Sequence, residues 1–289
     1  MSGFPAAAGS ASRRQLADGR WHFQHGPIDL VIDCDGDRQA CDAALRQAWM
    51  RFQEVLAELV PELARLRSPV AADTRIGDPR EQRIAARMVD ACRPYARHYG
   101  LFITPMAAVA GSVADEIVTS FRRGGVVRAY INNGGDIALH LAPGQRYDVG
   151  VVTNLVLPGI DGRFSIEASA TVRGIATSGW RGRSFSLGIA DSVTVLAQTG
   201  ATADAAATMI ANRVNVESPA VQRRAAAELK DDSDLGERLV TVAVGSLSGS
   251  EIATALAGGA AFAEEIRRRG LIAAAALSLQ GQARVVRSP

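Results

Sequence analysis

The sequence has few cysteines and no long apolar run. Its three cysteines, Cys34, Cys41 and Cys92, are odd in number and show no C-x-x-C spacing. This argues against a disulfide framework or a thiolate metal site, and it is typical of a reducing compartment. The chain lacks the run of about 20 apolar residues that a membrane helix requires, and residues 1–20 lack the apolar stretch of a signal peptide. We therefore expect a cytoplasmic protein without a membrane span.

A strong net charge is also absent. The formal net charge is +2, and Lys230 is the single lysine in the sequence. So small a charge gives no indication of binding to nucleic acid or to an anionic membrane. The 289 residues are 47% hydrophobic and 21% charged, which is typical of a globular chain. We expect a disordered lead-in, residues 1–19, followed by one domain, residues 20–289, and the composition leaves a homo-oligomer open.

The first part of the chain predicts a hairpin and several helices. Alternating residues on both sides of Gly26-Pro27 indicate two strands joined by a turn. An apolar stripe at three- and four-residue steps then indicates a long helix from Leu45 to Leu66, with a kink or restart at Pro61. Two further helices are expected, one from about Pro79 and one capped by Thr104.

The rest of the chain alternates strands, turns and helices. Strands are expected at Val126–Ile131, Ile137–Leu141, Tyr147–Asn154, Phe164–Val172 and Leu239–Val244, with a turn at Pro158–Gly162. A charged linker is expected at Glu217–Glu237, a helix at Ser250–Arg269 and a final hairpin at Leu271–Val286. This mixture predicts an α+β fold with a mainly antiparallel sheet flanked by helices.

The stretch from Gly174 to Asn212 carries the first candidate site. It reads as a turn ending at Gly179, a β-branched strand, and an alanine-rich helix capped by Thr202. Asp204 and Thr208 are four residues apart, so they share one face near the helix N-terminus. Beside free backbone N–H groups, this pair could hold a hard cation and a phosphate. Alternatively, Asp204 interacts only with the helix dipole, and Thr208 with its own backbone.

A second candidate follows the strand expected at residues 126–131. There the segment Asn132–Asp136, Asn-Asn-Gly-Gly-Asp, turns the chain into its next strand. Asn-Gly is the usual signal of a type I′ hairpin, so one interpretation gives the segment a structural role alone. In the other interpretation, Gly134, Gly135 and Asp136 form part of a binding site.

Several sequence blocks, in order, resemble one family. Gly174–Gly179, Ser192–Val195 and Ala203–Thr208 are similar to the C-terminal half of the ApbE family, the FAD:protein FMN transferases. Asn133–Ile137 resembles the Gly-Gly-Asp turn of that family, and Ala110–Asp115 resembles its helix start ending in Asp. The chain looks closer to a cytoplasmic branch of the family than to the transferases themselves. The resemblance implies a single T-fold-like domain of two related α+β halves.

The resemblance also implies ligands and roles. The family binds a flavin nucleotide, FAD or FMN, and uses Mg²⁺ to hold its diphosphate, and an acceptor protein is the further partner. Asp204 and Thr208 match the side chains that bind the metal. The remaining matches are expected around the nucleotide: Asp115, Gly134, Gly135, Asp136, Thr177, Ser178 and Gly179. We therefore expect these motifs to converge on one cleft.

Two departures from the family bear on its activity. Ala110 stands where the family has a lysine, and the family's His-x-x-Asp-Pro-Arg-Thr-Gly segment is missing. Arg181 and Arg183 could supply cations near the phosphates, and Asp191 is either a base or a residue at a strand end. The hypotheses are a flavin-nucleotide and Mg²⁺-binding protein with altered or lost transfer, a transferase that uses Asp191, and a non-catalytic structural or partner protein.

Overall fold

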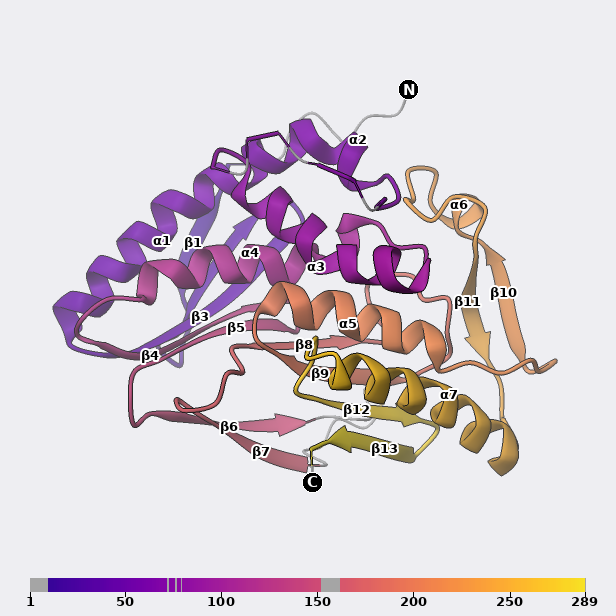
Figure 1. Ribbon diagram of the computed structural model, residues 1–289. Helices are drawn as coiled ribbons and strands as arrows, with labels where there is room; N and C mark the ends of the chain where they lie inside the picture. Colours follow the sequence, from indigo (N-terminus) through magenta and orange to yellow (C-terminus); the bar gives the residue numbers. More distant parts are fainter. Residues whose placement is uncertain (1–9, 72, 76, 79, 152–161, 289) are drawn as a thin grey trace.

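A computed structural model describes residues 10–71, 73–75, 77–78, 80–151 and 162–288. At its centre is a nine-stranded antiparallel sheet of order β1-β2-β3-β4-β5-β8-β9-β12-β13 (Figure 1). Its strands are β1 (Ser12–Gln15), β2 (Trp21–His25), β3 (Ile28–Gly36), β4 (Val126–Asn133), β5 (Asp136–Leu141), β8 (Gly174–Ser178), β9 (Ser192–Ala197), β12 (Ala274–Leu279) and β13 (Gln282–Arg287). The α+β fold expected from the sequence is confirmed.

The longer helices cover one face of this sheet (Figure 1). They are α1 (Arg38–Leu59), α3 (Arg83–Tyr99), α4 (Val109–Val118), α5 (Gly200–Arg213) and α7 (Gly249–Arg268). Strand β3 buries Leu30 and Ile32, and α1 buries a stripe that includes Ala48 and Phe52. Alternate strand residues and every third or fourth helix residue therefore meet in the main core. Within the described residues, none of the helices combines the length and apolarity that crossing a bilayer would need.

A small hairpin, β6 (Arg146–Val151) and β7 (Gly162–Glu167), lies on the opposite side of the sheet (Figure 1). Leu139 and Ile175 of the sheet pack there with Ile166 of the hairpin in a second, smaller core. The turn expected at Pro158–Gly162 falls almost entirely outside the described residues. The sheet is thus covered on one face by helices and over part of the other face by this hairpin.

Several expected elements are confirmed. The hairpin around Gly26-Pro27 is β2–β3, and the one beginning at Asn132 is β4–β5. At Pro61 the long helix passes into a 3₁₀ turn, Val60–Glu62, before the short α2 (Leu63–Leu66). A proline cannot donate the backbone hydrogen bond that continues an α-helix, which accounts for the interruption.

Other expectations are wrong near the chain's turns. Ser12–Gln15, inside the segment expected to be disordered, pairs with β2 as an edge strand. Gly174–Ser178 is not a turn but strand β8, because it pairs with β9 over its whole length. The expected linker, Glu217–Glu237, contains β10 (Val221–Ala225), which pairs with β11 (Leu239–Val244), and the short α6 (Ala226–Leu229).

Both expected helix caps are also corrected. Helix α5 begins at Gly200, and its cap is Thr199, whose hydroxyl accepts a hydrogen bond from the Thr202 amide at 3.1 Å. Thr104 precedes a 3₁₀ turn, Pro105–Ala108, and its hydroxyl donates to Asp234 instead of capping a helix. In the first case a nearby threonine caps the helix instead, and in the second a carboxylate far along the chain binds the hydroxyl, which sequence position alone does not reveal.

Helices α4 and α5 touch backbone to backbone. A Cβ atom added to Gly111 would lie 2.2 Å from the carbonyl oxygen of Gly200, and one added to Gly200 would lie 2.9 Å from the carbonyl oxygen of Gly111. Both residues are buried. The two helices can therefore approach this closely because neither has a side chain at the contact.

We predict that Gly111→Ala destabilises the protein by about 1–3 kcal/mol, as overpacking typically does. Helix propensity alone would give a gain of about 1 kcal/mol, so a net loss identifies the steric contact. Urea denaturation measures the free energy of unfolding. Gly124→Ala, whose Cβ would have no atom within 4 Å, is the control. A stabilised Gly111→Ala variant would contradict the contact.

Candidate functional site

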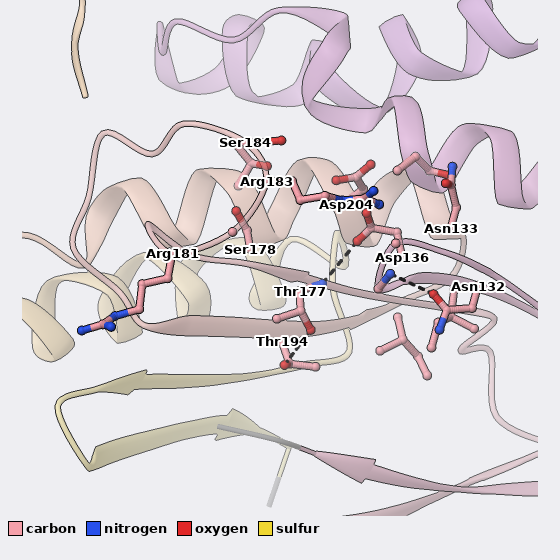
Figure 2. A pocket seen from close by; sticks show the side chains of 18 of the residues that line it. Asn132, Asn133, Asp136, Thr177, Ser178, Arg181, Arg183, Ser184, Thr194 and Asp204 are labelled. Carbon is pink, nitrogen blue, oxygen red and sulfur yellow. Dashed lines mark hydrogen bonds between the residues drawn. The ribbon is translucent and has the colours of Figure 1, made fainter. Parts of the chain in front are cut away.

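A cavity of about 720 Å³ lies where the β4–β5 turn, the end of β8 and helix α5 meet. Figure 2 shows side chains from these separate elements gathered around it. The residues expected from sequence that line it are Gly134, Gly135, Asp136, Thr177, Ser178, Gly179, Arg181, Arg183, Asp191, Asp204 and Thr208. The structure brings together motifs from distant parts of the chain, while the role of each residue stays a prediction.

The β4–β5 turn forms one wall. Gly134 and Gly135 have φ angles of 66° and 115°, a left-handed backbone that favours glycine. The Asn132 side-chain oxygen accepts a hydrogen bond from the Gly135 amide at 2.8 Å. The Asn133 side-chain amide donates to the Ala110 carbonyl at 3.1 Å, which ties the turn to α4. The expected hairpin is therefore confirmed, and because the same turn lines the cavity, its part in a binding site stays a prediction.

Asp136 and Asp204 lie side by side at the centre of the cavity (Figure 2). Burial raises the pKa of Asp136 to about 7, although its hydrogen bond from the Thr177 amide and the charge of Arg183 act in the opposite direction. Burial, and then the negative charge of Asp136, raise the pKa of Asp204 well above its usual range. Two carboxylates placed together in this way favour holding a proton or a cation between them.

Asp204 also has a structural contact. Its carboxylate accepts a hydrogen bond from the Gly111 amide at 3.0 Å, in the first turn of α4. A carboxylate there satisfies a donor that the helix itself leaves unpaired and also interacts favourably with the helix dipole. Asp204 therefore caps α4 from the neighbouring helix, whatever else it binds.

Asp115, expected beside the nucleotide, lies instead at the start of α5. Its two carboxylate oxygens accept hydrogen bonds from the amides of Gly200 and Ala201 at 2.9 and 2.8 Å. The side chain is buried, and burial raises its pKa while these two amides lower it. The first amides of α5, expected to be free for a phosphate, are thus bound by Asp115 and by the Thr199 cap.

The two arginines behave differently. The Arg183 guanidinium lies against the β4–β5 turn, since a Cβ on Gly134 would be 1.8 Å from one of its nitrogens. Arg181 points away from the paired carboxylates (Figure 2). It stacks on Trp180, 4.6 Å from the ring centroid, and its Nε is 3.5 Å from Asp191. Arg183 is therefore the better placed of the two to meet an anion at the centre of the cavity.

Asp191 is held by its neighbours. One carboxylate oxygen accepts a hydrogen bond from the Gln280 amide at 2.6 Å, and the other accepts one from the Trp180 indole at 3.3 Å. These contacts link the loop after β8 to the turn before β13. These contacts fit the strand-end interpretation of Asp191, while its role as a base stays a prediction.

A second cavity of about 310 Å³ adjoins the first. The two share lining residues, namely Ala110, Asp136, Arg183, Ser184, Asp204 and Thr208. Its outer rim includes Lys230 and Leu235, from the segment expected to be a linker. Sequence reasoning missed this rim, and it also missed Asn133. The adjacent Asn-Gly signal placed Asn133 in the turn, but nothing in the sequence pointed to its bond with Ala110.

A family model described as "AbpE bacteria" matches residues 13–285. The chain belongs to this family. This confirms the ApbE-like assignment made from the sequence motifs, and the match extends well beyond the region that carried them. The larger cavity of this ApbE-like protein is built largely from those motifs, whereas most residues that line the second cavity lie outside them.

Individual proteins are also similar to the chain. A UPF0280 protein of Methanopyrus kandleri is 28% identical over 216 residues, which cover 74% of this chain and 83% of that protein. One of Methanothermobacter thermautotrophicus is 38% identical over 51% of this chain and 57% of its own length. Similar solved structures include an ApbE protein of Thermotoga maritima and the flavin transferase ApbE of Vibrio cholerae. Their identities are 13% and 12%, and each has a TM-score of 0.44 with 96% of both chains covered.

We predict that Asp115→Ala lowers the free energy of unfolding by about 1–3 kcal/mol, because it leaves two buried amides without an acceptor. Chemical denaturation measures the loss. Asp42→Ala, at an exposed position of α1, is the control, and we expect it to change stability by less than about 0.5 kcal/mol. Equal stability of the two variants would refute the capping role of Asp115.

We also predict a pH dependence of stability that depends on Asp136. Its pKa is about 7 in the folded protein, against an ordinary value of 3.8 for an exposed aspartate, so between these values the folded state holds a proton that the unfolded state has lost. The free energy of unfolding therefore falls as pH rises through this window, by up to about 1.4 kcal/mol per pH unit for one proton. Denaturation of the cation-free protein at several pH values measures the slope, which Asp136→Asn should reduce. An unchanged slope would contradict the raised pKa.

Proposed function

We propose that this ApbE-like protein binds a flavin nucleotide, FAD or FMN, together with Mg²⁺, and that flavin transfer is altered or lost. The observation that carries the proposal is the pair Asp136 and Asp204, which lie together in the cavity with raised pKa values. Each holds a proton more readily than an ordinary aspartate unless a positive charge compensates for the other. A divalent cation is the simplest such charge, and it would also attract a diphosphate.

The donors around the pair suit a hard cation. No group of three or more His, Cys, Asp and Glu side chains that could hold a metal ion occurs in the described part of the chain. Mg²⁺ does not require one, because it prefers few carboxylates and takes its remaining ligands from hydroxyls, carbonyls, water and phosphate. Asp204 and Thr208 would hold the ion, with Asp136 beside them. When bound, it would neutralise phosphate charge.

The shape of the cleft fits a ligand with two ends. The two cavities meet at Asp136, Arg183 and Asp204, so a diphosphate at this junction would place one end of a dinucleotide in each. The Arg183 guanidinium would face the phosphates from the side of the β4–β5 turn. Gly134 leaves the space that this side chain occupies, since any Cβ there would collide with it.

The contacts of Asp191 support altered or lost transfer. A general base needs a free oxygen near the acceptor hydroxyl, whereas Trp180 and Gln280 engage both oxygens of Asp191. Ala110 also supplies no positive charge at the position of the family's lysine. In the described cleft, these two differences leave residues that suit nucleotide binding but remove two groups that would assist transfer: the lysine, and Asp191 as a free base.

We expect Thr208→Val to weaken Mg²⁺-dependent FAD binding by roughly 10-fold or more, because it removes a hydroxyl ligand while keeping the side chain's shape. Calorimetric titration with FAD, with and without Mg²⁺, measures the effect, and a parallel titration with FMN tests the mononucleotide. Thr119→Val, on the 3₁₀ turn Thr119–Phe121 after α4, is the matched control. If neither the removal of Mg²⁺ nor Thr208→Val changes the affinity for FAD, the proposed metal site is refuted.

We expect little covalent flavin transfer from this protein. Loss of a positioned general base typically removes a factor of about 10²–10⁴ in rate. The assay incubates the protein with FAD, Mg²⁺ and an acceptor protein, then reads in-gel flavin fluorescence. Robust labelling that Asp191→Asn abolishes would establish the alternative, a transferase that uses Asp191. Absence of FAD and FMN binding in the titrations would favour the structural or partner role.

A further inference from the structure

Two cysteines that are seven positions apart in the sequence come together at the junction of β3 and α1. Cys34 continues the inward-facing series of Leu30 and Ile32 along β3. Cys41 lies three residues before Ala44, so it begins the apolar stripe of α1. The strand and helix periodicities therefore direct both side chains into the same layer.

The two sulfur atoms are 2.8 Å apart. This is closer than two thiols pack without a hydrogen bond, and it is a short movement from the disulfide bond length of about 2.05 Å. Both residues are half-buried, so small molecules can reach them, whereas Cys92 is completely buried on α3. The chain thus contains an accessible thiol pair and a separate, inaccessible thiol.

We propose that Cys34 and Cys41 are an oxidisable pair that closes into an intramolecular disulfide when a disulfide oxidant is present. The bond would join the end of β3 to the first turns of α1. It lies outside the nucleotide cleft, because neither residue lines either cavity in the described structure. The inference is therefore independent of the proposed flavin function.

The reaction is thiol–disulfide exchange in two steps. The thiolate of one cysteine attacks a sulfur of the oxidant, which releases one small thiol and leaves a mixed disulfide on the protein. The second thiolate then attacks the protein sulfur of that mixed disulfide and releases the second small thiol. The protein loses two protons and two electrons, and the oxidant is reduced to two thiols.

The surroundings of the pair oppose spontaneous reaction. Burial raises the pKa of Cys34 well above its usual range, and the neighbouring Cys41 and the carboxylates of Asp33 and Asp35 raise it further. Because the thiolate is the reactive form, the pair stays reduced until an oxidant is supplied. Once one cysteine carries the mixed disulfide, the short distance between the two sulfur atoms favours formation of the intramolecular disulfide.

The test exposes the folded full-length protein to excess oxidised glutathione, then quenches with acid. The protein is next denatured, and its free thiols are alkylated with N-ethylmaleimide. Intact mass counts the labels, and peptide mapping locates them. The reduced protein should carry a label on each of its three cysteines. The oxidised protein should carry one label, on Cys92, and a peptide pair joined through Cys34 and Cys41. The buried Cys92 is the internal control.

Two serine variants and a measurement of thermal stability complete the experiment. Oxidation should raise the melting temperature of the wild-type protein, since a cross-link restricts the unfolded chain, and should not raise that of Cys34→Ser or Cys41→Ser. If a serine variant fails to fold, labelling of the wild-type protein decides alone. Retention of all three labels, stable glutathione adducts on Cys34 or Cys41, or a bridge that includes Cys92 would each overturn the proposal.

Discussion

The contact between α4 and α5 determines where the other parts of the site can lie. Gly111 and Gly200 let the two helix backbones meet, and each helix then satisfies the other's first amides. Asp115 of α4 binds the amides of Gly200 and Ala201, while Asp204 of α5 binds the amide of Gly111. Helix starts leave several amides unpaired, so this reciprocal capping fixes both the position and the direction of the pair.

The geometry of the cleft depends on this contact between α4 and α5. The start of α4 brings the Ala110 carbonyl to Asn133, which anchors the β4–β5 turn. The anchored turn then holds Asp136 beside Asp204. Its Gly134 leaves space for the side chain of Arg183. The central carboxylates therefore belong to elements that are already rigid for reasons of folding. Positions of this kind are where a binding site keeps its geometry most accurately.

Local sequence patterns predicted the parts of the structure that depend on interactions between residues close in sequence. The Gly-Gly turn needs left-handed backbone at Gly134 and Gly135, and apolar periodicity identifies the helices. The errors arose where several partners compete. Asp115 matched a binding motif, yet its carboxylate accepts hydrogen bonds from two amides of a helix far along the chain. Thr199 displaced Thr202 as the cap of α5 by a single helical turn. The Thr199 error is local, because two threonines in one segment both suit a cap. For Asp115, no pattern within one segment contains the information, because the deciding amides come from elsewhere in the fold.

The capping of α5 has a consequence for how the cleft would respond to its surroundings. A helix N-terminus often supplies a permanent positive pole for a phosphate, but here Asp115 occupies the first amides of α5. Under the proposed function, the charge that balances a phosphate must come from Arg183 and from an exchangeable ion. Binding of the ion and of the nucleotide would then be thermodynamically linked, each strengthening the other by the same factor. Occupancy of the cleft would follow the free Mg²⁺ concentration as well as the supply of nucleotide.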